Sequence, residues 1–180
     1  MQLFKTPEHA ATFAIRYNSQ QYAQTPMAKQ LARDAGGSGK GLVGLDGSAQ
    51  AGMILARLDR MSEMERACIV ARFAHRTDVC PCCEGQRPTP QYKAALMALA
   101  EWARPFIRDE VDSQRMRYGL VQSFFDRKAS ITQLASSLGR PARTVLDQKN
   151  KVWPDLAKLD KNAQAAMGDM LSDLCGDVAE

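Results

Sequence analysis

The chain has 180 residues, with 24 lysines and arginines against 20 aspartates and glutamates, which gives a formal net charge of +4. Apolar residues make up 45% of the chain and charged residues 24%, a composition typical of a soluble globular protein of one domain. No apolar run approaches the roughly 18 residues that cross a membrane, and residues 1–17 lack the basic start and apolar core of a secretory signal. Five cysteines, an odd number, argue against a disulfide framework. We therefore expect a cytoplasmic protein with thiols free for metal binding or packing.

Two threonine–proline pairs predict the first helices. Thr6–Pro7 and Thr25–Pro26 each place a capping hydroxyl before a proline at the first helical position. The second of these helices ends at Gly36, and the glycine-rich stretch from Gly36 to Gly47 predicts a flexible connector. Residues 1–47 are thus expected to form N-terminal helices and a glycine-rich loop.

Residues 48–180 are expected to form one helical body. Ser48 is predicted to begin a helix, and Ser62 begins the next one with a capping box that Glu65 completes. No segment shows the period-2 alternation of a strand. The fold class is therefore all-α, with sigma-factor-like helix pairs, a helix-turn-helix and a small irregular insert rich in cysteine. The insert covers 75–89, and the later helices are predicted at 90–102, 112–127, 130–138, 141–152 and 155–175.

Positive charge is concentrated in residues 113–151. This block holds eight basic and two acidic side chains, a net charge of +6, whereas residues 152–180 hold two basic and six acidic ones, a net charge of −4. Such a basic block is suited to contact nucleic-acid phosphates, because their neutralisation supplies most non-specific affinity. A solvated helix face has the same composition and is the alternative.

Residues 131–151 predict a DNA-binding helix-turn-helix. Counted from Ile131, the pattern requires a small residue at position 5, where the helices cross, a glycine at the turn at position 9 and an apolar residue at position 15. Ala135, Gly139 and Val145 occupy these positions, and Ser130 is suited to cap the first helix. The alternative is an ordinary helical hairpin with a glycine turn.

The second helix of this motif is amphipathic. Its outer face offers guanidinium groups for guanine or phosphate, an amide for adenine and a hydroxyl for phosphate. Position 18 departs from the pattern, because Gln148 stands where an apolar residue is usual; Leu146, Val152 and Trp153 would then close the core instead. The polar face comprises Arg140, Arg143, Thr144, Asp147, Gln148 and Lys151.

The cysteine insert predicts a structural zinc site. Its sequence Cys-Pro-Cys-Cys-Glu-Gly over residues 80–85 contains Cys-Pro-x-Cys-x-Gly. Two thiolates on such a turn can hold one zinc ion, backbone amides offset their charge, and the glycine permits a left-handed turn. A closed zinc site needs four ligands, and a metal would hold an insert that lacks its own core. The expected ligands are Cys80 and Cys83, with His75 third and Cys68 or Cys82 fourth.

Two alternatives compete for the cysteines. Cys68 stands inside an apolar run and is equally suited to be a small buried hydrophobe. A redox dithiol would need a strand–helix context that this insert lacks.

Two helix pairs separated by a cysteine-bearing insert resemble the Q-type transcription antitermination factors of lambdoid phages and their AlpA-like bacterial relatives. The first pair is Gly52–Phe73, with the sequence GMILARLDRMSEMERACIVARF, and the second is residues 131–150. The resemblance covers roughly residues 48–175. It implies a phage-related transcription regulator that binds double-stranded DNA near a late promoter and engages RNA polymerase paused with its sigma factor. Such a factor then travels with the polymerase and narrows the RNA exit channel, so that terminators are read through.

The resemblance also implies which residues act. The N-terminal half and its glycine loop become candidates for contacts to RNA polymerase or nascent RNA. The DNA-binding role falls on Arg140, Arg143, Thr144, Gln148, Lys149 and Lys151.

Two other functions compete with antitermination. A helix-turn-helix repressor or activator acting at initiation usually dimerises on a palindromic site. A thiol- or metal-dependent enzyme would use the cysteine insert. Since no Ser/His/Asp set or carboxylate pair stands out, we expect a protein that is not an enzyme.

Overall fold

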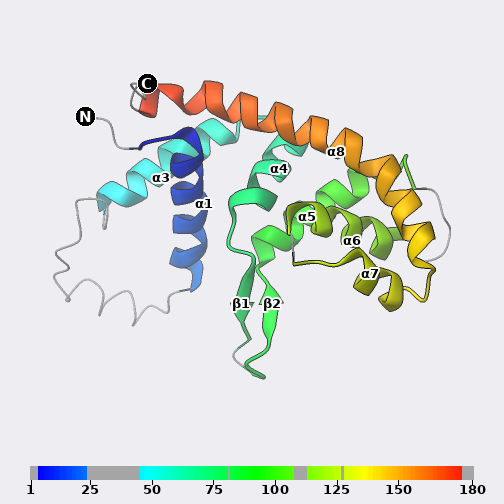
Figure 1. The fold of residues 1–180 in the computed structure, drawn as a ribbon. Helices are drawn as coiled ribbons and strands as arrows, with labels where there is room; N and C mark the ends of the chain where they lie inside the picture. Colours follow the sequence, from blue (N-terminus) through cyan, green and yellow to red (C-terminus); the bar gives the residue numbers. More distant parts are fainter. Residues whose placement is uncertain (1–3, 24–44, 81, 108–112, 127, 176–180) are drawn as a thin grey trace.

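The computed structural model describes residues 4–23, 45–80, 82–107, 113–126 and 128–175 (Figure 1). The fold is all-α, with one short antiparallel hairpin, as the sequence predicts for its class. The N-terminal half contains α1 (Pro7–Ala23), α3 (Leu45–Leu58), α4 (Glu63–Phe73), and the hairpin strands β1 (Thr77–Val79) and β2 (Gln86–Pro88). The C-terminal half contains α5 (Pro90–Trp102), α6 (Ser113–Phe125), α7 (Ile131–Ser137), α8 (Ala142–Leu171) and the short 3-10 helix η1 (Ser172–Leu174).

Helix starts follow the caps that the sequence predicts. Thr6 Oγ1 accepts a hydrogen bond from the His9 amide at 3.2 Å. Ser62 and Glu65 form the reciprocal capping box at the start of α4, and Thr89 and Ser130 cap α5 and α7 with their side chains. Each of these capping side chains accepts a hydrogen bond from an amide three residues further along the chain. These helix starts therefore depend on neighbouring residues only.

The start of α3 differs from the prediction. The helix begins at Leu45, before Ser48, so the last residues of the expected connector are helical. The predicted helix after Thr25–Pro26 and the rest of the connector lie outside the described residues.

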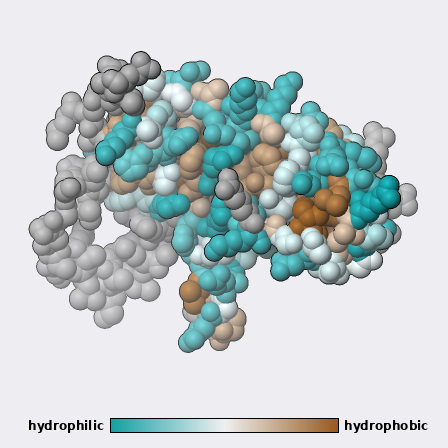
Figure 2. All heavy atoms as spheres, viewed as in Figure 1, coloured by the Kyte–Doolittle hydropathy of each residue, from teal (hydrophilic) through white to brown (hydrophobic). Residues whose placement is uncertain are grey.

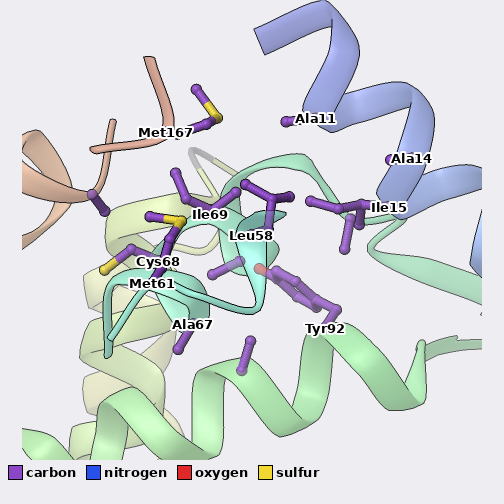
Figure 3. Packing of buried hydrophobic residues seen from close by; sticks show 14 of the residues in the cluster. Ala11, Ala14, Ile15, Leu58, Met61, Ala67, Cys68, Ile69, Tyr92 and Met167 are labelled. Atoms are coloured by element: carbon purple, nitrogen blue, oxygen red, sulfur yellow. The ribbon is translucent and has the colours of Figure 1, made fainter. Parts of the chain in front are cut away.

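Two hydrophobic cores hold the helices together. The larger core gathers buried residues of α1, α3, α4, α5 and the second half of α8, and Figure 3 shows Ile15, Leu58, Ile69 and Met167 meeting there. The smaller core lies at the α7 end of the molecule (Figure 1) and comprises Ala103, Ile107, Met116, Leu120, Ala135, Leu138, Val145 and Val152. Since α8 contributes to both cores, it connects the two ends of the molecule.

The helix α8 is continuous where two helices were expected. Pro154 lies inside it and is exposed, although proline removes one helical hydrogen bond. Val152 and Leu156 on either side are fully buried, in the smaller and the larger core respectively. Packing on both sides of Pro154 therefore keeps the helix together, and the prediction of a break here is wrong.

The cysteine insert forms a β-hairpin that projects from the helical body (Figure 1). Its register pairs Thr77 with Pro88 and Val79 with Gln86. The base is fixed to the body, because Arg76 donates hydrogen bonds to the Phe125 carbonyl at 2.7 Å and to the Asp126 carboxylate at 3.0 Å. Strands of three residues are too short to show the period-2 alternation by which a strand is recognised in a sequence. The insert was therefore predicted to be irregular.

None of the described helices combines the length and hydrophobicity needed to cross a membrane.

Candidate nucleic-acid interface and metal centre

The turn between α7 and α8 is a Schellman motif. Gly139 has a φ of +61°. Its amide donates to the Ser136 carbonyl at 3.1 Å, and the Arg140 amide donates to the Ala135 carbonyl at 3.0 Å. These two bonds satisfy the last carbonyls of α7, and the left-handed conformation favours glycine. The predicted role of Gly139 is confirmed.

The positions that the motif assigns to the interior are buried. Ala135 and Val145 are 3% and 0% exposed and both belong to the smaller core. The contact between α6 and α7 is close at Gly119, where an added Cβ would lie 2.4 Å from a methyl carbon of Leu134. The pair of helices is therefore held at a fixed place on α6.

The outer side of this helix pair carries cations without partners. Arg143 and Lys151 are exposed, and Arg140 and Thr144 are half-buried at the start of α8. Within the described part of the chain, none of the three cations forms an ion pair. The turn and the first half of α8 thus present three cationic side chains that are available to an anionic partner.

Gln148 differs from its predicted DNA-binding role. Its Oε1 is buried and has no hydrogen-bond partner. A bidentate contact with adenine needs both the oxygen and the nitrogen of the amide, so Gln148 cannot make it as placed. The side chain instead occupies the inner position that the motif normally gives to an apolar residue.

Lys149 is also placed differently from the prediction. Its ammonium lies 4.0 Å from the centre of the Trp153 ring, in a cation–π contact. The indole nitrogen of Trp153 donates to the Leu120 carbonyl at 3.2 Å, which fixes the ring. Leu146, expected to close the core, is 43% exposed, whereas Val152 is buried there as expected.

The basic block does not lie wholly at the surface. Arg117 is buried, and its Nε donates to the Ala100 carbonyl at 3.0 Å. It therefore satisfies a carbonyl at the end of α5 and is not available to phosphate.

The hairpin tip brings three thiols together. The Sγ atoms of Cys80, Cys82 and Cys83 all lie within 4.8 Å of one another. The Cys80 amide donates to the Gly85 carbonyl at 2.8 Å, and the Glu84 amide donates to the Cys80 carbonyl at 2.9 Å. These bonds close the tip into a compact turn, and the cluster could hold a metal ion.

The thiols of this cluster are not equivalent. A hydrogen bond from the Cys82 thiol lowers the pKa of Cys80 to about 7, helped by the backbone amides of Cys82 and Cys83. The same thiol–thiol interaction raises the pKa of Cys82. Cys80 is thus the group most readily present as a thiolate, which is the form that binds metals.

Two predicted ligands do not join the cluster. Cys68 lies on α4 and is fully buried in the larger core (Figure 3), where burial raises the pKa of its thiol to about 12. His75 lies at the base of the hairpin, with its Nε2 3.9 Å from the Asp78 carboxylate. Since the hairpin extends away from α4, it separates the tip thiols from both residues. Those two ligand predictions are corrected.

The prediction also assigns the left-handed conformation at the tip to the wrong residue. Glu84, with a φ of 54°, adopts this conformation, and Gly85 does not. Cys82, which the sequence offered only as a spare fourth ligand, belongs to the cluster. In the sequence, the feature that indicates Cys82 as a ligand is its position directly before Cys83 within a tight turn.

No protein-family model matches the chain, and a search of curated proteins finds no match. The function is therefore inferred from the sequence and from two features of the structure: an unpaired cationic surface on the α7–α8 turn and the first half of α8, and a cluster of three thiols at the end of a hairpin.

Proposed function

We propose that the protein binds double-stranded DNA through the start of α8. The observation that carries the proposal is that three cations, Arg140 at the α7–α8 turn and Arg143 and Lys151 on α8, have no ion-pair partner among the described residues. Not every cation of the protein is open in this way, since Arg57, Arg72 and Arg76 bind carboxylates. Cations left open beside a helix that begins at a tight turn suit the phosphates and base edges of a major groove.

Each side chain has a distinct role in this proposal. Arg143, exposed on the second residue of α8, contacts a guanine edge. Arg140 and Lys151 bind phosphates on either side of it, and Thr144 donates its hydroxyl to a phosphate. Lys149 covers the Trp153 ring and Gln148 has a buried amide oxygen, so neither side chain has a direct DNA contact in this proposal.

The biological role that we propose is transcription antitermination. It rests on the resemblance of residues 48–175 to Q-type factors, together with the DNA-binding surface. In this role the protein, which is not an enzyme, binds DNA near a promoter, loads onto paused RNA polymerase with its sigma factor and allows read-through of terminators. Regulation of initiation by a repressor or activator is the competing role, and the transcription experiment below separates the two.

We further propose that the three tip thiols supply three of the four ligands of one zinc ion that stabilises the hairpin. Sulfur donors within 4.8 Å of one another suit zinc, which takes cysteine thiolates as ligands. Purified protein should contain about one zinc per chain, and Cys80→Ser with Cys83→Ser should abolish it. A double variant that retains full zinc would contradict the site. A variant that still regulates transcription would exclude a thiol- or metal-dependent enzyme.

DNA binding is tested first with Arg143→Ala. Fluorescence anisotropy on DNA from the protein's own neighbouring promoter region should show a loss of about 1–3 kcal/mol, with reduced preference over scrambled DNA. The matched control is Arg60→Ala, which removes an exposed arginine near the end of α3. Equal losses in the two variants would contradict the proposed interface. Equal weakening on cognate and scrambled DNA would make Arg143 a phosphate contact.

The biological role is tested by transcription in vitro on that promoter with a terminator downstream. Antitermination predicts more full-length transcript beyond the terminator, only with the cognate promoter region and less with Arg143→Ala. A change in initiation with constant termination efficiency would instead indicate a repressor or activator.

A further inference from the structure

A pocket of about 400 Å³ lies between α5, α6 and α7, outside the proposed DNA-binding surface. Its apolar lining comes from Met97, Tyr118, Leu134 and Leu138. Figure 2 shows hydrophobic residues gathered over α6 and α7, bordered by hydrophilic ones. The volume lies within the range of small-molecule sites, roughly 300–1,000 Å³.

The charge of this pocket is of one sign. Lys93 on α5 and Arg115 on α6 line it, and no aspartate or glutamate is among its described lining residues. Neither cation forms an ion pair within the described part of the chain. Two unpaired cations beside an apolar surface repel each other weakly, and a bound anion would interact favourably with both.

The apolar lining is partly exposed to solvent. Met97 is 38% exposed, and Leu134 is only half-buried although it contacts Gly119. Apolar side chains that line a pocket together with a few polar groups are typical of small-molecule sites. A DNA phosphate could contact the two cations of this pocket but not its apolar lining. A ligand that carries both a negative charge and an apolar body fits the pocket better.

We propose that this pocket binds a small organic anion, namely a carboxylate or sulfonate attached to an aromatic or aliphatic body. The anionic group contacts Arg115 and Lys93, and the body lies on Met97, Tyr118 and the two leucines. Because Leu134 lies on α7 and packs against the smaller core, and Leu138, the C-cap of α7, belongs to that core, the bound ligand also stabilises the position of α7. The proposal stands on the pocket alone and is independent of DNA binding.

The experiment uses two fluorescent probes in the absence of DNA. 8-Anilinonaphthalene-1-sulfonate carries a sulfonate, and N-phenyl-1-naphthylamine has the same aromatic body without it. Titrated into the full chain, the sulfonate should saturate at one site and bind at least about tenfold more tightly than the neutral probe, through charge-assisted hydrogen bonds. Equal affinities, or no saturation, would overturn the proposal.

Variants then locate the site. Arg115→Glu should raise the dissociation constant of the sulfonate at least about tenfold and leave that of the neutral probe within about twofold. Met97→Gln should weaken both probes, because it removes the apolar contact. Arg60→Glu is the matched control for net charge and should change neither by more than about twofold. If Arg60→Glu weakens the sulfonate as much as Arg115→Glu does, the attraction is that of the whole protein and the pocket is excluded.

Circular dichroism on each variant confirms that it is folded. Displacement of the sulfonate by dodecanoate or by benzoate then distinguishes an aliphatic from an aromatic ligand. Displacement by either supports the proposal, and displacement by neither at millimolar concentration contradicts it. Since no DNA is present, failure of this experiment leaves the DNA-binding proposal unaffected, and the reverse also holds.

Discussion

Arg72 and Arg143 have the same side chain but opposite surroundings. Arg72 lies against the larger core, where its Nε donates to the Asp160 carboxylate at 3.1 Å and Asp160 is only 7% exposed. Arg143 stands exposed on the α7–α8 turn, without an ion pair among the described residues. The thiols show the same contrast, since Cys68 is enclosed by the core while Cys80 lies in the cluster at the hairpin tip.

This contrast distinguishes side chains that stabilise the fold from side chains that are available for binding. A group whose partner is inside the protein contributes to folding, because its removal leaves that partner buried and unpaired. A group left open at the surface contributes little to folding and is available to a ligand. The larger core therefore carries the stability of the molecule, and the turn and the hairpin tip carry its candidate functions.

The largest contrast should appear in thiol reactivity. In metal-free folded protein at neutral pH, Cys80 should react with iodoacetamide more than about 1,000-fold faster than Cys68, because only the thiolate is nucleophilic. The pKa of Cys80 is lowered to about 7 and that of Cys68 is raised to about 12. The rate at Cys80 should thus rise as pH increases through 7 and level off above it. Peptide mass spectrometry measures both rates, and comparable labelling of Cys68 would contradict its placement in the core.

A smaller but substantial effect is expected on folding. Arg72→Met should lower the free energy of unfolding by about 2–3 kcal/mol, somewhat less than the roughly 3–5 kcal/mol of a fully buried pair, because Arg72 itself is 38% exposed. Chemical denaturation measures it. The matched control, Arg143→Met, should change stability by less than about 0.5 kcal/mol. Equal effects of the two variants would remove the contrast between the two regions.

The close contact between α6 and α7 predicts an intermediate effect. Gly119→Ala should destabilise the protein by about 1–2 kcal/mol, since the new methyl group would overlap Leu134. Gly52→Ala is the control, because nothing lies within 4 Å of a Cβ there, and it should stabilise α3 by about 0.5–1 kcal/mol. Adding Leu134→Ala to Gly119→Ala should cost less than Leu134→Ala alone. Simple additivity would show that the two residues do not touch.

The smallest effect is expected at Lys149. Replacing it by Met removes the cation–π contact with Trp153 and should cost about 0.5 kcal/mol of stability. The affinity of the Lys149→Met variant for DNA should fall less than that of the Arg143→Ala variant, because Lys149 covers the Trp153 ring and does not face a phosphate. Thermal denaturation and fluorescence anisotropy measure the two quantities. A loss of affinity as large as that of Arg143→Ala would place Lys149 in the DNA-binding surface after all.

The sequence by itself determined the local features of this protein. The caps at Ser62 and Ser130 and the left-handed turn at Gly139 were predicted correctly. Each depends on hydrogen bonds between residues a few positions apart, so the residue types that make them are visible in the sequence. The all-α class followed from the same signals.

Only the tertiary structure decided what happens between distant elements. Packing against two cores keeps α8 continuous through Pro154, and contacts with α5 and α6 bury Arg117 and hold the ring beneath Lys149. The direction of the hairpin separates Cys68 and His75 from the three tip thiols. The physical reason is common to all three: a side chain's partner depends on which elements meet in space, and those contacts join residues that the spacing of a sequence does not relate.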